Sequence, residues 1–125
     1  MKKLLILLFS ILISFNSYGD SSDETICVET DAQERDGIIY LPNEIQPFTG
    51  KHLCKYENGQ IEIEASYKDG KVDGKVTSWH ENGQIEIEAN YKDGKANGKF
   101  IGWYENGQIK SEKYYKDGEC ISGDC

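Results

Sequence analysis

The sequence predicts an all-β protein, built as an elongated antiparallel meander of stacked β-hairpins. A unit of 24 residues begins at Tyr56, at His80 and at Tyr104, and the third copy, residues 104–125, has 22 residues. A repeat of this length is one supersecondary unit that buries its apolar surface against the next copy. Each unit also contains Asn-Gly and Asp-Gly, the strongest short signals for a hairpin turn. Between the turns, apolar and polar residues alternate, as along residues 61–67, which is the period of a half-buried strand.

Residues 1–19 are typical of a signal peptide. Two lysines precede the apolar run Leu4–Phe15, and Ser17 and Gly19 are the small residues expected before a cut at Asp20. The apolar run is too short to cross a bilayer, which needs about 20 residues. The sequence therefore predicts an extracytoplasmic protein, periplasmic or secreted, after cleavage. The alternative is an uncleaved N-terminal anchor.

The predicted mature chain is a small and strongly acidic domain. The full chain has a net charge of −8, with 14 basic and 22 acidic residues. Loss of Lys2 and Lys3 leaves 12 basic residues and changes the net charge to −10. Nucleic acid is a poor partner for such a chain, because nucleic-acid binding depends on cations that neutralise phosphates. An anionic membrane surface is disfavoured for the same reason.

Four cysteines follow the predicted cut: Cys27, Cys54, Cys120 and Cys125. An even number in a small exported chain favours disulfide bonds. Of the three possible pairings we expect Cys27–Cys54 and Cys120–Cys125, since these bonds would staple the two ends of the array. A zinc site is the alternative, but the chain has no C-x-x-C pair, and its only histidines are His52 and His80. We therefore expect no metal.

The segment before the repeats divides into two parts. Residues 20–35 are polar and acidic, and we expect a flexible acidic leader there. Residues 36–55 resemble a partial unit, because Thr49-Gly50-Lys51 precedes Tyr56 by the interval at which Asp73-Gly74-Lys75 precedes His80. Residues 38–40 would form the earlier strand of that unit. The repeat domain then covers residues 36–125, with units at 56–79, 80–103 and 104–125.

Counting outward from a two-residue turn at Asp69-Gly70 predicts the register of each hairpin. The expected pairs are Tyr67–Val72, Ala65–Gly74, Glu64–Lys75 and Ile63–Val76, and in the next unit Tyr91–Ala96, Ala89–Gly98, Glu88–Lys99 and Ile87–Phe100. Apolar residues then face apolar ones and acids face lysines, contacts that contribute roughly 0.2–1 kcal/mol each. The face that carries Glu64, Lys75, Glu88 and Lys99 is called the Glu/Lys face below. The same count puts Trp79 and Trp103 on this face, unless a bulge at the Asn-Gly turn moves them to the opposite face.

Two sets of side chains are candidates for binding a partner. The first is an acidic strip expected on one face: Glu62, Glu64, Glu86 and Glu88. The second is a set of aromatic residues and one histidine beside the Asn-Gly turns: Tyr56, Trp79, His80, Trp103 and Tyr104. The alternative for the strip is a solvated face neutralised by lysines. The alternative for the aromatic set is packing against the next repeat, although exposed aromatics are common anchors for partners.

The sequence gives little support for catalysis. Neither histidine lies in a nucleophile or metal pattern, and the glycines belong to turns rather than to a phosphate-binding loop. The repeated glutamates share one kind of environment, whereas acid–base catalysis needs two carboxylates in unlike environments. We therefore expect a protein that is not an enzyme and that uses no cofactor.

The repeat resembles a known family. The motif runs Tyr-x-Asn-Gly-Gln-Ile, then Tyr-Lys-Asp-Gly-Lys, then x-Gly-Lys, and it is similar to the bacterial MORN-repeat variant found in the YwqK-type antitoxin family. Residues 46–51, Gln-Pro-Phe-Thr-Gly-Lys, are similar to the partial repeat that often opens such proteins, and the resemblance covers residues 36–118. The resemblance implies an elongated meander of hairpins that binds other proteins or, as proposed for some MORN proteins, membranes.

These observations lead to one function and two alternatives. We expect non-enzymatic protein binding outside the cytoplasm, and the resemblance implies an antitoxin or immunity-like component of a toxin–antitoxin system, with a toxin as the protein partner. The first alternative is a cell-envelope or membrane-associated scaffold. The second is a binder of basic peptides through the acidic strip, sensitive to salt. The lysines of the last hairpin, Lys110, Lys113 and Lys116, either suppress pairing at an open sheet edge or mark a docking edge.

Overall fold

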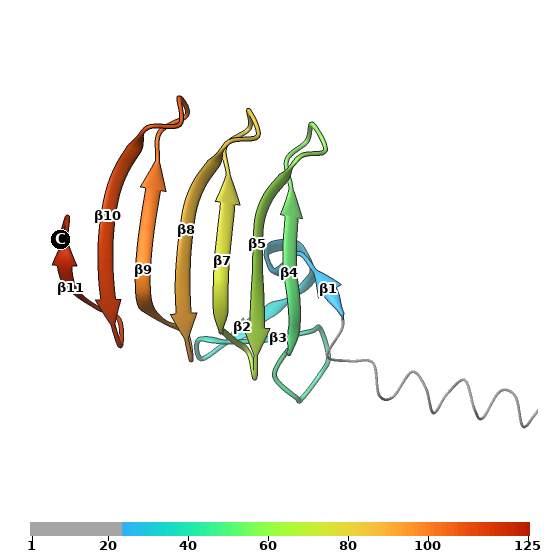
Figure 1. The fold of residues 1–125 in the computed structure, drawn as a ribbon. Coiled ribbons are helices and arrows are strands. Elements are labelled where there is room, and N and C mark those ends of the chain that lie inside the picture. The colour runs from blue at the N-terminus through green and yellow to red at the C-terminus, as the bar shows by residue number, and fades with distance from the viewer. Residues whose placement is uncertain (1–23) are drawn as a thin grey trace, which may run out of the picture.

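The computed structural model describes residues 24–125, which form one large antiparallel sheet with a small N-terminal segment against it (Figure 1). The sheet has nine strands in the order β1-β4-β5-β7-β8-β9-β10-β11, with β6 paired to β5. The elements are β1 Thr25–Ile26, α2 Val28–Asp31, β2 Gln33–Arg35, β3 Ile38–Tyr40, β4 Gly50–Lys55, β5 Ile61–Lys68, β6 Lys71–Val72, β7 Gly74–Trp79, β8 Ile85–Lys92, β9 Lys95–Trp103, β10 Ile109–Lys116 and β11 Glu119–Gly123. The predicted meander of hairpins is confirmed. The expected signal peptide lies outside the described residues.

The two kinds of turn differ in conformation. At the Asp-Gly turns both residues have positive φ, 51° and 79° for Asp69 and Gly70, as a type I′ turn requires. At the Asn-Gly turns only the glycine has positive φ, 89° at Gly59. There the Gly59 N–H donates to the Tyr56 carbonyl at 2.9 Å, and the Asn58 side-chain oxygen accepts from the Gln60 N–H at 2.9 Å. The Asn-Gly dipeptide thus lies within the loop of residues 56–60 and does not form a two-residue type I′ turn.

The predicted register holds next to the Asp-Gly turns and then fails by two residues. Tyr67 pairs with Val72 as expected, but Ile63 pairs with Ser78 instead of Val76. The shift arises between β6 and β7, where Gly74 has a φ of 107° and the Asp73 N–H bonds back to the Ser66 carbonyl at 2.9 Å. Gly98 has a φ of 110° at the same place in the next unit, where Ile87 pairs with Gly102. A shift of two residues keeps each side chain on its predicted face.

A second irregularity in each unit interrupts the alternation of side chains between the two faces, at Glu86 in the second unit. Just after each Asn-Gly turn the strand carries one extra residue, so that Trp79 pairs with Ile85 while Ser78 pairs with Ile87. Such a bulge re-aims a side chain. Along β7, Trp79 follows buried Ser78 and therefore lies on the opposite, Glu/Lys face.

One face of the sheet, called the apolar face below, carries the core. Its buried residues are His52, Cys54, Ala65, Ser78 and Ala89. The core is thin because a single sheet has no second layer over most of this face. Half-buried side chains such as Ile87 and Phe100 lie between the buried positions. Among the described residues, no helix is long and apolar enough to cross a membrane.

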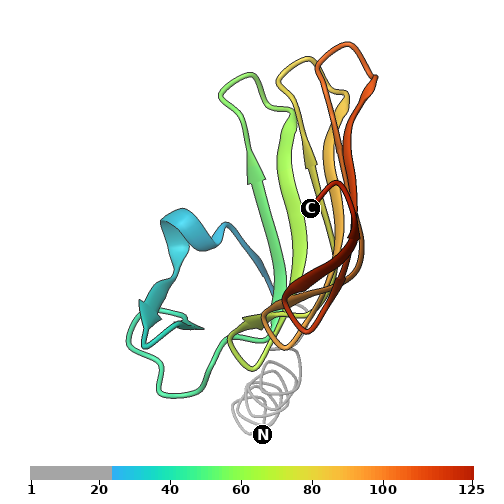
Figure 2. The ribbon, with the colours of Figure 1, turned by 90° about the vertical axis from the view of Figure 1, so that its left-hand side faces the viewer.

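Residues 24–47 cover the apolar face only at its first strands (Figure 2). The Ile39 N–H donates to the Gly70 carbonyl at 3.0 Å, and the Gly70 N–H donates to the carbonyl of buried Phe48 at 2.7 Å. β3 pairs with β2 in a separate two-stranded sheet, and β1 pairs in parallel with β4. The expectation that Ile38–Tyr40 forms a strand of a partial repeat in the array is therefore wrong, because this strand crosses the face as part of a cover.

The C-terminal edge of the sheet is closed along only part of its length. β11 pairs with β10 between Lys113 and Lys116, and the Asp124 carboxylate accepts from the Glu112 N–H at 2.8 Å. Within the described residues, no strand pairs with the outer edge of β10 from Ile109 to Ser111. Ile109 is accordingly 58% exposed.

We predict that Ala89→Leu destabilises the protein by about 1–3 kcal/mol, because overpacking a filled position displaces its neighbours. Ala89 is 0% exposed and pairs with Val76 and Phe100 on adjacent strands. Urea unfolding of the oxidised protein measures the effect. Ser66→Leu, at an exposed position on the Glu/Lys face, is the control and should change stability by less than about 0.5 kcal/mol. Equal losses in both variants would contradict the assignment of the faces.

Candidate functional site

Two members of the aromatic set, Tyr56 and His80, tie one Asn-Gly turn to the end of the strand that precedes the next such turn. The Tyr56 hydroxyl donates to the Trp79 carbonyl at 2.6 Å. His80 takes the same position one unit later, and its Nε2–H donates to the Trp103 carbonyl at 2.9 Å. The adjacent asparagines repeat the pattern, since the Asn58 and Asn82 amides donate to the carbonyls 23 residues further on, at 3.3 and 3.0 Å.

Tyr104 is the exception within this set. It continues the series of Tyr56 and His80, but its hydroxyl has no hydrogen-bond partner in the described part of the chain, and the residue is 50% exposed. Trp79 and Trp103 are half-buried. Of the predicted aromatic set, Tyr104 is therefore the member most available to a partner.

The four glutamates do not form the expected strip. Glu88 lies on the Glu/Lys face, where it makes an ion pair with Lys75 at 3.7 Å, and Glu64 is exposed on the same face. Glu86 lies at the bulge and instead contacts Ser78 at 3.3 Å and His80 at 3.4 Å. Glu62 occupies the equivalent bulge and has a carboxylate oxygen within 4.8 Å of the Cys54 sulfur. The prediction that all four share one face is wrong, because the bulges turn Glu62 and Glu86 toward the apolar side.

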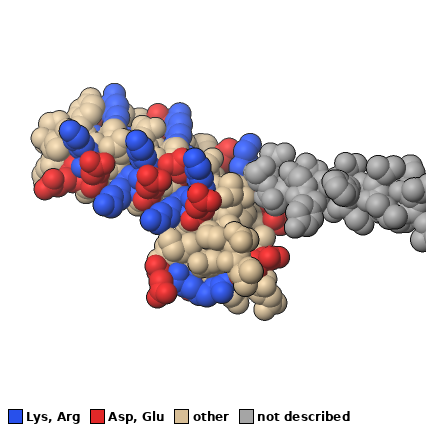
Figure 3. Space-filling view, turned by 90° about the horizontal axis from the view of Figure 1, so that it is seen from below, with Lys and Arg blue, Asp and Glu red and all other residues tan. Residues whose placement is uncertain are grey.

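The Asp-Gly end of the sheet carries mixed charge. Lys68 and Lys71 flank the first turn as a directly opposed pair, and Lys92 and Lys95 flank the second. Figure 3 views this end from below and shows lysines interleaved with acidic side chains. Charges of both signs at this spacing favour a solvated surface over a site for one charged partner.

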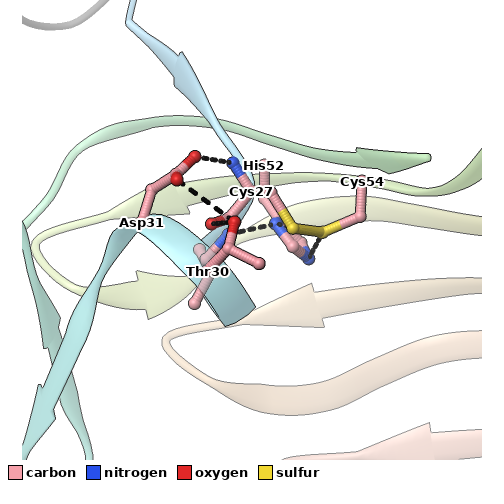
Figure 4. The surroundings of a disulfide bond; sticks show 6 residues. Cys27, Thr30, Asp31, His52 and Cys54 are labelled. Carbon is pink, nitrogen blue, oxygen red and sulfur yellow. Dashed lines mark hydrogen bonds between the residues drawn. A yellow bond between two sulfur atoms is a disulfide. The ribbon is translucent and has the colours of Figure 1, made fainter.

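Both predicted disulfides are present, and the first joins the N-terminal segment to the apolar face. Cys27 is bonded to Cys54, and Cys120 to Cys125. Figure 4 shows His52 beside the first bond. The His52 Nδ1 accepts from the Val28 N–H at 3.0 Å and lies 3.8 Å from the Cys54 sulfur. The Asp31 carboxylate accepts from the Cys27 N–H at 3.0 Å, which holds the start of the short helix α2.

The Cys27–His52–Cys54 cluster has donor atoms close enough for a metal ion. One ligand atom from each residue lies within 4.8 Å of the others. Both sulfur atoms are joined in the disulfide, however, and metal binding requires free thiolates. The oxidised cluster therefore acts as a structural staple. The sequence did not reveal the position of His52, whose only signal was its spacing of two residues from Cys54.

A hollow of about 840 Å³ lies on the apolar face near the second and third Asn-Gly turns. Its floor is formed by Ile87, Phe100 and Gly102, and Lys110 and Lys113 line the side formed by β10. Gly102 has no side chain, and it pairs with Ser111, which is also small. These two positions leave the space that larger residues would fill. No sequence signal predicts this hollow, because it depends on the register of three strands.

We predict that Tyr56→Phe lowers the stability by about 1 kcal/mol, the usual effect of losing one hydrogen bond. The Tyr56 hydroxyl bonds the Trp79 carbonyl at 2.6 Å. Tyr104→Phe is the matched control and should leave the free energy of unfolding unchanged within about 0.5 kcal/mol. Chemical denaturation of the two variants gives the comparison, and equal effects would show that the hydroxyl bond to Trp79 does not stabilise the array.

We predict that His52 makes the stability fall as the pH is lowered. Burial lowers the pKa of His52 from its ordinary value of 6.5, so the unfolded chain takes up a proton first as the pH falls below that value. Stability contributed by the neutral ring is complete above about pH 6.5 and is lost progressively below it. The melting temperatures of wild type and His52→Gln, measured between about pH 7.5 and 5.5, test this. A parallel pH dependence in the variant would rule out His52 as a source.

Comparison with known proteins gives a family and nothing more specific. Neither a curated protein nor a solved structure matches this chain significantly. The family model of the MORN repeat variant matches three consecutive segments, residues 48–69, 72–93 and 96–117. These segments cover more than half of the chain and recur with the 24-residue period of the structure. The chain therefore belongs to the MORN repeat variant family.

Proposed function

We propose that this chain is an exported, non-enzymatic repeat protein that binds another protein. The observation that carries the proposal is the partly open apolar face. The N-terminal segment covers the face at the first strands, and no described segment lies over the hollow at Phe100 and Gly102. The hollow combines the apolar side chains of Ile87 and Phe100 with polar and charged groups, and binding sites are commonly concave with both kinds of group. Exposed Tyr104 borders the same hollow.

Export is supported by the cysteines and by the N-terminal sequence. Two disulfides in a small domain suit an oxidising compartment, and residues 1–19 have the pattern of a signal peptide. The proposed location is therefore the periplasm or the extracellular space.

Within this function, we favour an antitoxin or immunity-like role. The support is the resemblance of the repeat motif to the YwqK-type antitoxins. Together with export, this role requires a toxin that acts in the cell envelope. An envelope scaffold is the alternative, and the two roles differ in the number and kind of proteins bound.

The test is a cross-linked pull-down of the tagged, full-length gene product from its native cells, read by mass spectrometry. The same experiment reports the N-terminus, the disulfides and the partners. We expect a chain that begins at Asp20 with all four cysteines oxidised, and one dominant protein partner that is harmful when expressed alone.

Three outcomes would contradict parts of the proposal. A chain that retains residues 1–19 with reduced cysteines would exclude export. Recovery of only lipid, wall fragments or abundant envelope proteins would exclude the antitoxin role in favour of a scaffold. Absence of any specific protein would exclude protein binding.

A further inference from the structure

The third repeat changes the charge of the apolar face. The strand after the Asn-Gly turn reads Ile-Glu-Ile-Glu-Ala in the first two units, but Ile-Lys-Ser-Glu-Lys in the third, residues 109–113. Lys113 takes the place of buried Ala89 and pairs with Phe100. Lys110 takes the place of Glu86 at the bulge. Two lysines thus replace an alanine and a glutamate on the face that forms the core elsewhere.

Both lysines line the hollow, and neither is paired with a carboxylate in the part of the chain that the structure describes. No ion pair involves Lys110 or Lys113 among residues 24–125. The Lys110 ammonium lies 5.9 Å from the centre of the Tyr104 ring, a distance at which the ring attracts a cation. The charges on the side formed by β10 are therefore available to a ligand.

The acidic groups of the hollow are placed differently. Glu86, on the side formed by β8, accepts from the Ser78 hydroxyl and contacts the His80 ring. Glu105 lies in the loop between β9 and β10. The hollow is therefore polarised, with its free cations along β10 beside an apolar floor. This is unusual on a chain whose net charge is −8.

We propose that this hollow, called the Lys110–Lys113 groove, binds an extended acidic segment of a partner protein. A carboxylate of the segment pairs with Lys110 or Lys113, and an adjacent apolar or aromatic side chain packs on Phe100 and Gly102. The volume of about 840 Å³ suits a few residues of peptide. The proposal rests on the protein-binding function above and adds the chemistry of the partner. The partner's segment is negatively charged, whereas the acidic strip expected from the sequence would bind a basic peptide.

The test is a selection of random 12-residue peptides displayed on phage against the immobilised, oxidised protein. We expect enrichment of peptides with acidic residues beside an aromatic or apolar residue. Fluorescence anisotropy with the best labelled peptide then compares wild type, Lys110→Glu/Lys113→Glu and the milder Lys110→Gln/Lys113→Gln. Charge reversal should weaken binding at least about tenfold, and neutralisation should weaken it less.

The matched control is Lys99→Glu/Lys116→Glu, which reverses two exposed lysines on the same strands, β9 and β10, outside the groove. This variant should bind the peptide within about twofold of wild type, since its charges are screened from the groove. Thermal melts confirm that each variant folds, and the glutamine variant remains informative where charge reversal unfolds the chain.

Several results would overturn the groove without touching the protein-binding function. These are enrichment of basic peptides, absence of enriched peptides, and equal affinity in the groove and control variants. Capture of the native partner in equal amounts by wild type and by the glutamine variant would also overturn it. Protein binding as such fails only when wild type captures no partner from its native cells.

Discussion

The structure depends on hydrogen bonds that join each turn to a neighbouring hairpin. At the Asp-Gly end, the N–H groups of Gly70, Gly94 and Gly118 donate to carbonyls 22 residues earlier, at 2.7–2.8 Å. The N–H groups of the preceding aspartates bond to the side chains of Thr49, Asp73 and Asn97. At the other end, the Tyr56 hydroxyl and the His80 ring donate to the Trp79 and Trp103 carbonyls, which lie just before the next Asn-Gly turn. Because turns at both ends of the sheet are tied to their neighbours, the strands keep one register along the array.

This arrangement stabilises the middle of the array better than its ends. A single sheet buries little apolar surface, and its outer strands lack a neighbour on one side. A disulfide bond stabilises each end. Cys27–Cys54 holds the N-terminal cover on β4, and Cys120–Cys125 closes the chain after β11. Such bonds typically contribute about 2–4 kcal/mol, and the short C-terminal loop contributes less.

Much of the fold could be predicted because the signals are local and repeated. The turns, strands and disulfide pairs follow from the spacing of Asn-Gly, Asp-Gly and cysteine. The register shift at Gly74 and Gly98 could not be predicted, since this part of the chain is held by bonds such as Asp93 N–H to Asp73 Oδ1, which joins different repeats. The cover was missed for another reason, because residues 24–47 have no periodicity and gain their structure from contacts with β4 and Gly70.

The candidate site was predicted less well than the fold. Sequence reasoning identified Tyr104 and the lysines of the last hairpin, but it placed Glu62 and Glu86 on the wrong side. A bulge of one residue reverses a face, so a site on such a sheet cannot be read from alternation alone.

The hydrogen bonds between repeats also bear on how this chain could have evolved. The hydrogen bonds that link one turn to the corresponding part of the next hairpin span 20 to 23 residues, less than one unit. Duplication or deletion of a whole unit in the gene would therefore reproduce the same bonds at a new junction. An insertion of any other length would break them. The array can thus change in length by steps of one unit while its ends, the cover with its disulfide and the last hairpin with Lys110 and Lys113, remain the same. Variation of this kind would alter the distance between the two ends and leave the chemistry of each end unchanged.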